Sequence, residues 1–161
     1  MPNRTAFSAA LVLLLAAGCG PERPATLDAE WALFLERQGR FFESVEARDA
    51  DGVAALFSEA AVLHVANMPP LEGREAIRQF YGNLFDYLTG SHAVPEETHM
   101  SASGDMAYGI GRTFNEFRGP EGPVGYAGKY ALVWYKLEGE WMIVFYGVSS
   151  NEPAPSPGRP A

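Results

Sequence analysis

Hydrophobic residues at helical spacing mark the first half of the chain. Over residues 27–47 they recur every three to four positions on one broad face, which predicts an amphipathic helix with Thr26 as its N-cap. A short helix is expected over residues 52–59, after a break that is rich in aspartate. Helical spacing returns between Gly73 and Gly90, so three helices are predicted.

The second half of the chain alternates apolar and polar residues, a period that is typical of strands. A first strand is predicted earlier, over residues 61–66, between the second and third helices. Helices followed by an antiparallel meander imply the α+β class. The four long strands are expected at residues 92–103, 106–117, 125–136 and 141–149.

The first eighteen residues have the composition of a targeting segment. The apolar run over residues 6–18 reaches only about 20 Å as a helix, whereas a bilayer core needs about 30 Å. A secretory signal fits better. The segment LAAGC, which ends at Cys19, resembles the lipobox of bacterial lipoproteins, in which the cysteine takes a diacylglycerol. The alternative is an ordinary signal that is cleaved near Gly18, with Cys19 incidental.

These features divide the chain into four parts. We expect a signal peptide with lipobox over residues 1–18, a tether over 19–26, one domain over 27–151 and a disordered Pro-rich tail over 152–161. Gly20, which is not aspartate, favours the outer membrane by resemblance to Gram-negative sorting. The expected localisation is therefore the cell envelope, with the domain lipid-anchored at Cys19 and facing the periplasm.

The composition and net charge of the chain limit the classes of binding partner that we expect. The chain has 161 residues, a formal charge of −8 and 47% hydrophobic residues, which suits one globular domain. Without a basic stripe, an acidic chain is repelled by nucleic-acid phosphates, so we expect no nucleic-acid partner. Anionic lipid headgroups would repel the domain as well, so any membrane contact is expected only through the lipid anchor.

Motifs for metals and cofactors are missing from the sequence. The single cysteine excludes an internal disulfide and Cys-rich metal sites, and His64, His92 and His99 have no metal-ligand spacing. Glu97 and His99 share a strand face, but alternation puts Glu96 on the other face. We therefore expect no metal and no cofactor.

Several sequence segments, in their order along the chain, resemble the SnoaL-like and ketosteroid-isomerase-like branches of the nuclear transport factor 2-like superfamily. They are FFESVEARDADGVAALFSEAAVLHV, LEGREAIRQFY, SGDMAYGIG and GKYALVWYKLEGEWMIV, and together they cover about residues 34–151. The resemblance implies a cystatin-like cone of three helices packed in a strongly curved antiparallel sheet around an apolar pocket. Members of the family are often dimers through the sheet, and their chemistry varies widely.

The isomerase site of that family carries over only in part. Its general-base aspartate corresponds to His64, by the distance to Gly73. The oxyanion-donating tyrosine falls on Phe41 and the donating aspartate on Ala131, neither of which can donate a hydrogen bond from its side chain. Many relatives carry His-Asp where this chain has Phe145-Tyr146. Steroid isomerisation by the family's mechanism is therefore not expected.

Three residues are candidate ligand contacts. Alternation places His64 on one face with Val62 and Ala66, and the resemblance implies that this face lines the pocket. An imidazole that is kept neutral by burial is therefore expected there, as a general base or an anchor. The alternative is a core histidine bonded to a neighbour. Tyr146 shares a face of the last strand with Met142, Val144 and Val148, which the resemblance implies is the pocket face, so it is expected either to donate to a ligand or simply to pack. Arg112 either binds a carboxylate in the pocket or is solvated and ion-paired, with Glu116 as a candidate partner.

Three functions are compatible with the sequence. The first is an envelope lipoprotein whose domain binds a small apolar or amphipathic molecule in a central pocket. The second is an isomerase, cyclase or dehydratase with His64 as general base. The third is a non-catalytic module that forms a homodimer through its sheet.

Overall fold

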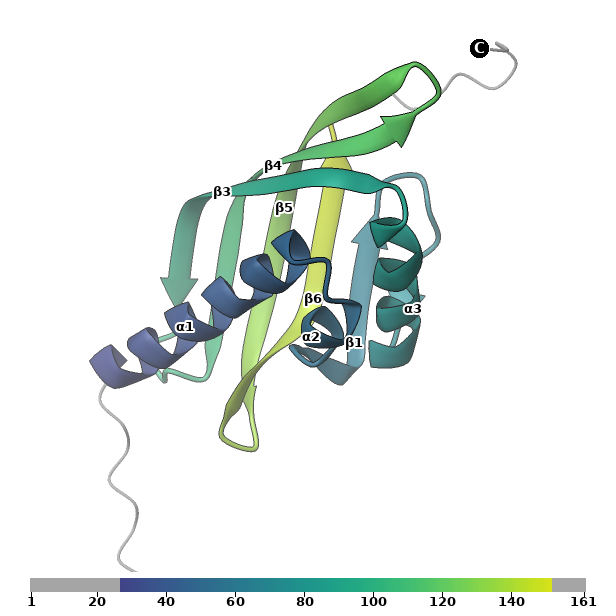
Figure 1. Ribbon diagram of the computed structural model, residues 1–161. Coiled ribbons are helices and arrows are strands. Elements are labelled where there is room, and N and C mark those ends of the chain that lie inside the picture. Colours follow the sequence, from purple (N-terminus) through teal and green to yellow (C-terminus); the bar gives the residue numbers. More distant parts are fainter. Residues whose placement is uncertain (1–26, 152–161) are drawn as a thin grey trace, which may run out of the picture.

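One curved sheet covered on one face by three helices makes up the domain (Figure 1). The computed structural model describes residues 27–151, so the expected signal peptide, Cys19, the tether and the Pro-rich tail lie outside the described residues. The elements are α1 (Leu27–Glu46), α2 (Ala50–Ala54), β1 (Phe57–Val65), β2 (Leu71–Glu72), α3 (Arg74–Phe85), β3 (Leu88–Met100), β4 (Met106–Gly119), β5 (Gly122–Leu137) and β6 (Glu140–Ser150).

The six strands lie in the order β2-β1-β6-β5-β4-β3. Four of the neighbouring pairs are antiparallel, and β1 runs parallel to β6. The α+β class and the cone-like fold are thus confirmed, and the expectation of a wholly antiparallel sheet is wrong at this one pair. The reason is topological: the meander begins at the far edge with β3, so β6 returns beside β1 in the direction of β1.

Helix α1 crosses the concave face of the sheet and buries one stripe of side chains (Figure 1). Phe34 packs edge-on against Trp134 and Trp141, with ring centroids 5.8 and 5.4 Å away. At the start of the helix, Lys136 Nζ donates to the buried Glu30 Oε1 at 2.5 Å, which fastens α1 to β5. The buried positions of the helix are Glu30, Phe34, Gln38 and Phe41.

The second helix begins and ends earlier than expected. Asp49 caps it, because its carboxylate accepts a hydrogen bond from the backbone N–H of Gly52 at 2.9 Å. The chain then enters β1 at Phe57, four residues before the predicted start of that strand.

Among residues 27–151 no helix combines the length and the apolar character that crossing a bilayer requires.

Candidate functional site

A cavity of about 120 Å³ lies between the sheet, the C-terminal half of α1 and helix α3. Most of its wall is apolar: Phe41, Phe42 and Val45 come from α1, and further aromatic and aliphatic side chains come from α3 and the strands. Within the described part of the chain, no Asp, Glu, His, Lys, Arg or Cys lines it. This inner cavity therefore offers an apolar environment with few polar groups.

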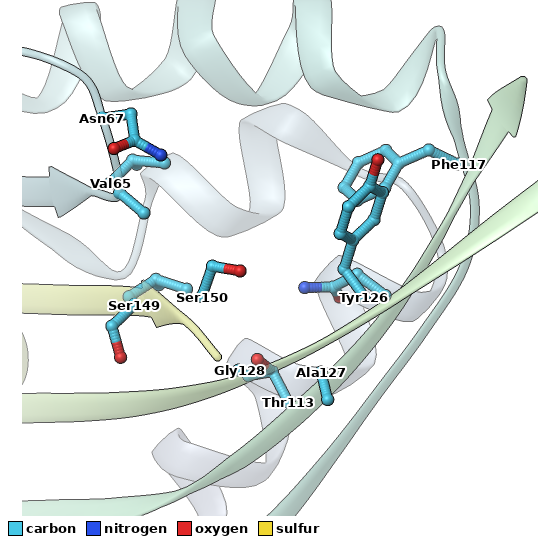
Figure 2. Close-up of a pocket in the computed structure, with 12 residues that line it drawn as sticks. Val65, Asn67, Thr113, Phe117, Tyr126, Ala127, Gly128, Ser149 and Ser150 are labelled. Atoms are coloured by element: carbon cyan, nitrogen blue, oxygen red, sulfur yellow. The ribbon is translucent and has the colours of Figure 1, made fainter. Parts of the chain in front are cut away.

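A wider space of about 370 Å³, which we call the mouth, lies next to the inner cavity (Figure 2). Figure 2 shows Val65 and Asn67 on one side of this mouth and Phe117 and Tyr126 on the other. The two spaces adjoin each other and share part of their lining. The shared residues are Val65, Thr113, Asn115, Phe117 and Val148.

Strand β4 supplies two polar side chains where the inner cavity meets the mouth. Thr113 is 6% exposed, and its Oγ1 has no hydrogen-bond partner among the described residues. Asn115 Oδ1 accepts a hydrogen bond from Ser91 Oγ at 2.8 Å, which leaves the Asn115 amide nitrogen free to donate. A buried hydroxyl without a partner is costly, so Thr113 Oγ1 is available to form a hydrogen bond with a molecule or a water in this space.

The third polar group is Tyr146 on β6. Its ring packs edge-on to Phe41 at 5.3 Å and lies 6.4 Å from the ring of Tyr130. Burial, and secondarily the neighbouring Tyr130, raises the pKa of Tyr146 well above its usual value. Burial raises the pKa of Tyr81 in the same way. Both phenols therefore stay protonated at neutral pH and act as hydrogen-bond donors rather than bases.

Local backbone features create the room at Thr113. Its partner across the β4–β5 ladder is Gly128, where an added Cβ would lie 2.9 Å from Thr113 Oγ1 and 2.3 Å from the carbonyl oxygen of Ser149. A side chain at this position would fill the space beside the hydroxyl. Strand alternation then places Thr113 and Asn115 on the same face of β4.

The expectation that His64 points into the pocket is wrong. His64 is exposed, does not line the inner cavity, and contacts the ring of Phe145 at 5.2 Å. The opposite alternate set of β1 faces the helices, with Ala61 and Leu63 fully buried. That set buries more apolar area than Val62 and Ala66 would, and this decides the orientation. The greater bulk of Leu63 was the signal that could have shown this.

The position that corresponds to the donating aspartate of the isomerase family, Ala131, also lies outside the cavity. Ala131 is only partly buried and lies next to Gly147 across the β5–β6 ladder, and it does not line the inner cavity. Its buried neighbours along the strand, Tyr130 and Leu132, face the helices instead. Phe41 does line the cavity, so its wall lacks a hydroxyl at that point, as the resemblance implied.

Tyr146 lies in the cavity wall, on the face that alternation predicted. Val148 lines the cavity beside it, whereas Met142 and Val144 do not. The reason is a bulge: Val133 pairs with Phe145 and Trp134 with Ile143, so Val144 is an extra residue that shifts the alternation. That Tyr146 binds a ligand stays a prediction.

Arg112 lies away from the cavity. Its Nε donates to Glu96 Oε1 at 2.6 Å, and both side chains are about half exposed. The ion-paired alternative therefore describes it, with Glu96 as partner instead of Glu116. Glu97 and His99 lie 3.5 Å apart at the surface. Across residues 27–151 no group of three or more His, Cys, Asp or Glu side chains is arranged to hold a metal ion.

Two site residues, Thr113 and Asn115, were missed at the sequence level. The pattern of β4 already put Thr113 with Ala107, Gly109 and Gly111 on a face of small residues. Thr113 is a polar residue that continues this face of small residues, and this was the signal that could have identified it as a site residue.

The fold and its pocket define a nuclear transport factor 2-like domain. Residues 39–142 match the SnoaL-like domain family, so the chain belongs to this family. No match was found among curated proteins.

Solved structures share the fold at low sequence identity. A ketosteroid isomerase-like protein from Erwinia carotovora atroseptica is 18% identical, with 77% of this chain and 98% of that chain covered and a TM-score of 0.69. A type 2 hexachlorocyclohexane dehydrochlorinase is 18% identical, with 81% and 91% covered and a TM-score of 0.65. A protein of the NTF2-like family from Streptomyces avermitilis is 17% identical, with 78% and 98% covered and a TM-score of 0.64. At these identities the likeness shows the fold alone.

Proposed function

We propose that the domain binds a small, uncharged and mainly apolar molecule that carries a hydrogen-bond acceptor. The observation that carries this proposal is Thr113 Oγ1, which is buried, faces the cavity and has no partner among the described residues. The Tyr146 hydroxyl and the Asn115 amide are further donors at the same cavity. A cavity of this size suits a single ring, since apolar cavities of about 150 Å³ take up benzene.

An enzymatic role is the alternative, because similar structures include a ketosteroid isomerase-like protein and a dehydrochlorinase. Both names imply proton transfer, which needs a base within hydrogen-bond reach of the substrate. The described lining of the inner cavity offers donors but no carboxylate or imidazole, and His64 lies elsewhere. Binding is therefore the better supported function.

Binding can be tested with phenol, which has one ring and one oxygen. Calorimetry should show binding to the wild-type domain, and native mass spectrometry should show any ligand retained on purification. Ala93→Phe, which fills the cavity wall, should abolish binding, whereas Ala60→Phe at an exposed position of β1 should not. Equal binding by wild type and Ala93→Phe would contradict the proposal.

We also propose that Cys19 anchors the domain by lipid to the envelope, in a Gram-negative host to the outer membrane facing the periplasm. The support is the position of the only cysteine at the end of a small-residue cleavage site, followed by Gly20. Intact mass of membrane-extracted protein should begin at Cys19 with acyl additions, and Cys19→Ala should release the protein from the membrane. An unmodified Cys19, or a start elsewhere, would contradict the anchor.

A second candidate function, homodimerisation, is favoured by the face of the sheet that the helices leave open. Tyr108, Ile110 and Phe114 of β4 alternate on that face and are 36–44% exposed. Tyr135 of β5, which pairs with Met106 across the ladder, extends the same apolar surface. We propose that a second copy of the chain covers this open face.

A further inference from the structure

We propose that the mouth is a second subsite, which binds the uncharged, hydroxyl-bearing part of an amphipathic ligand whose apolar ring fills the inner cavity. A monosaccharide attached to a small ring is the simplest molecule of this class. The proposal rests on the proposed binding function and extends it from the inner cavity to the mouth.

The first argument is charge. The chain as a whole carries −8, yet no described residue that lines the mouth is charged. The polar lining consists of amide and hydroxyl side chains, including Asn67, Thr113 and Asn115. A charged headgroup would lose hydration there without gaining a counter-charge, so the lining favours a neutral group that both donates and accepts hydrogen bonds.

The second argument is the aromatic pair on the far side of the mouth. The rings of Phe117 and Tyr126 lie 5.8 Å apart, and Tyr126 is 44% exposed. Figure 2 shows these rings across the mouth from Asn67. Tyrosine offers a rigid and amphipathic surface, and asparagine and serine offer adaptable hydrogen bonds. A sugar ring suits this arrangement, because its C–H face can lie on the aromatic rings while its hydroxyls reach the amides.

The third argument is that the two spaces adjoin. Thr113 and Asn115 line both the inner cavity and the mouth, so a ligand bound at these two residues lies at the border of both spaces. A wholly apolar ligand would fill the inner cavity but leave the polar lining of the mouth without new partners. The mouth is also the larger space, at about 370 Å³ against about 120 Å³. The ligand is therefore expected to carry its larger part outside the inner cavity.

Three probes distinguish by calorimetry between a wholly apolar ligand, a ligand with a neutral hydroxyl-bearing group and a ligand with a charged group. They are phenol, phenyl β-glucoside and phenyl phosphate. We expect the glucoside to bind at least tenfold more tightly than phenol, and the phosphate to bind no more tightly than phenol. Equal affinity for phenol and glucoside, or tightest binding of the phosphate, would overturn the mouth subsite while leaving the inner cavity as a binding site. If none of the three binds, the proposed function itself is wrong and the subsite with it.

Two variants locate the effect. Tyr126→Ala should bring the affinity for the glucoside down to within about threefold of that for phenol and leave phenol binding unchanged, because Tyr126 does not line the inner cavity. Tyr87→Ala is the matched control, since Tyr87 is 63% exposed and lines neither the mouth nor the inner cavity. It should leave both affinities unchanged. Full glucoside binding by Tyr126→Ala would overturn the subsite.

Discussion

Thr113 shows how a single hydroxyl can connect stability to binding. Its Oγ1 is buried and unpaired among the described residues, so the folded protein bears a desolvation cost. We predict that Thr113→Val, which keeps the shape and removes the hydroxyl, raises the free energy of unfolding by about 1 kcal/mol. The same change should weaken phenol binding about fivefold. Urea denaturation and calorimetry measure the two effects.

A paired hydroxyl nearby provides the contrast. Ser91 Oγ donates to Asn115 Oδ1 at 2.8 Å, so Ser91→Ala removes a hydrogen bond and should lower the free energy of unfolding by about 1 kcal/mol. Opposite signs for the two variants are the expected result. A loss of stability in Thr113→Val would mean that its hydroxyl already has a partner.

Buried tyrosines make stability depend on alkaline pH. Burial raises the pKa of Tyr146 above the usual value of 10.0 and that of Tyr130 to about 12. Above pH 10 the unfolded chain therefore loses phenolic protons that the folded chain keeps, and stability falls as pH rises. Each such tyrosine contributes a slope of up to about 1.4 kcal/mol per pH unit.

We predict that Tyr146→Phe makes this alkaline fall shallower. The free energy of unfolding, measured in urea at intervals between pH 8 and 11, should decline less steeply above pH 10 in the variant than in wild type. Below pH 10 the difference between the two proteins should not change with pH. Parallel curves above pH 10 would show that Tyr146 is not buried as a neutral phenol.

At the level of single residues, the orientation of a side chain was the hardest feature to predict. Both alternate sets of β1 mix apolar and polar residues, so the choice between Leu63 and His64 depends on packing that distant segments supply. Tyr146 was placed on the correct face, although a bulge at Val144 changed which residues share it. A bulge leaves no periodic trace in the sequence, and one extra residue reverses the alternation on one side of it.

Whole elements were predicted far better than orientations. The expected helix over residues 27–47 is α1, and the four expected long strands are β3 to β6 with ends shifted by up to four residues. Such long segments repeat their hydrophobic period many times, which makes their type readable from the sequence. The parallel pairing of β1 with β6 was not predictable in this way, because it joins segments about eighty residues apart.

Strand β4 depends on its glycines for close packing. A Cβ at Gly111 would lie 2.3 Å from the carbonyl oxygen of Val94 and 2.7 Å from the Tyr130 ring. We predict that Gly111→Ala lowers the free energy of unfolding by about 2–4 kcal/mol, because strand β3 or the ring must move. Gly125→Ala on β5 is the matched control, since nothing lies within 4 Å of its added Cβ. Thermal and urea unfolding measure both, and equal stability of the two variants would contradict the packing argument.

For the molecule as a whole, the mouth and the start of α1 lie far apart. Leu27, at the start of α1, lies beside Gly104, which is two residues before the start of β4 at Met106. The mouth is formed farther along β4, at Thr113 and Asn115. Seven residues of β4 separate Met106 from Thr113, which is about 23 Å along the strand at about 3.3 Å per residue. If Cys19 anchors the chain as proposed, the tether joins the domain at the end away from the mouth.

The open face of the sheet determines the expected assembly. Its exposed apolar residues lie on neighbouring strands β4 and β5, with Arg112 and its partner Glu96 beside them. A two-fold contact would place this surface against itself, so each side chain is buried in both copies. Aromatic residues with an arginine nearby are typical of such interfaces, and burying them removes apolar area from water.

We predict that the described domain is a dimer by light scattering and that Ile110→Glu makes it monomeric, raising the dissociation constant at least 100-fold. The reason is that two unpaired carboxylates would be buried at the centre of the contact. Leu33→Glu is the matched control, because Leu33 is 51% exposed but lies on α1, on the other side of the sheet. It should leave the dimer intact. A wild-type domain that stays monomeric at high concentration would exclude the dimer. A dimer that Leu33→Glu disrupts and Ile110→Glu does not would place the interface elsewhere. Phenol binding in the inner cavity would be unaffected by either result.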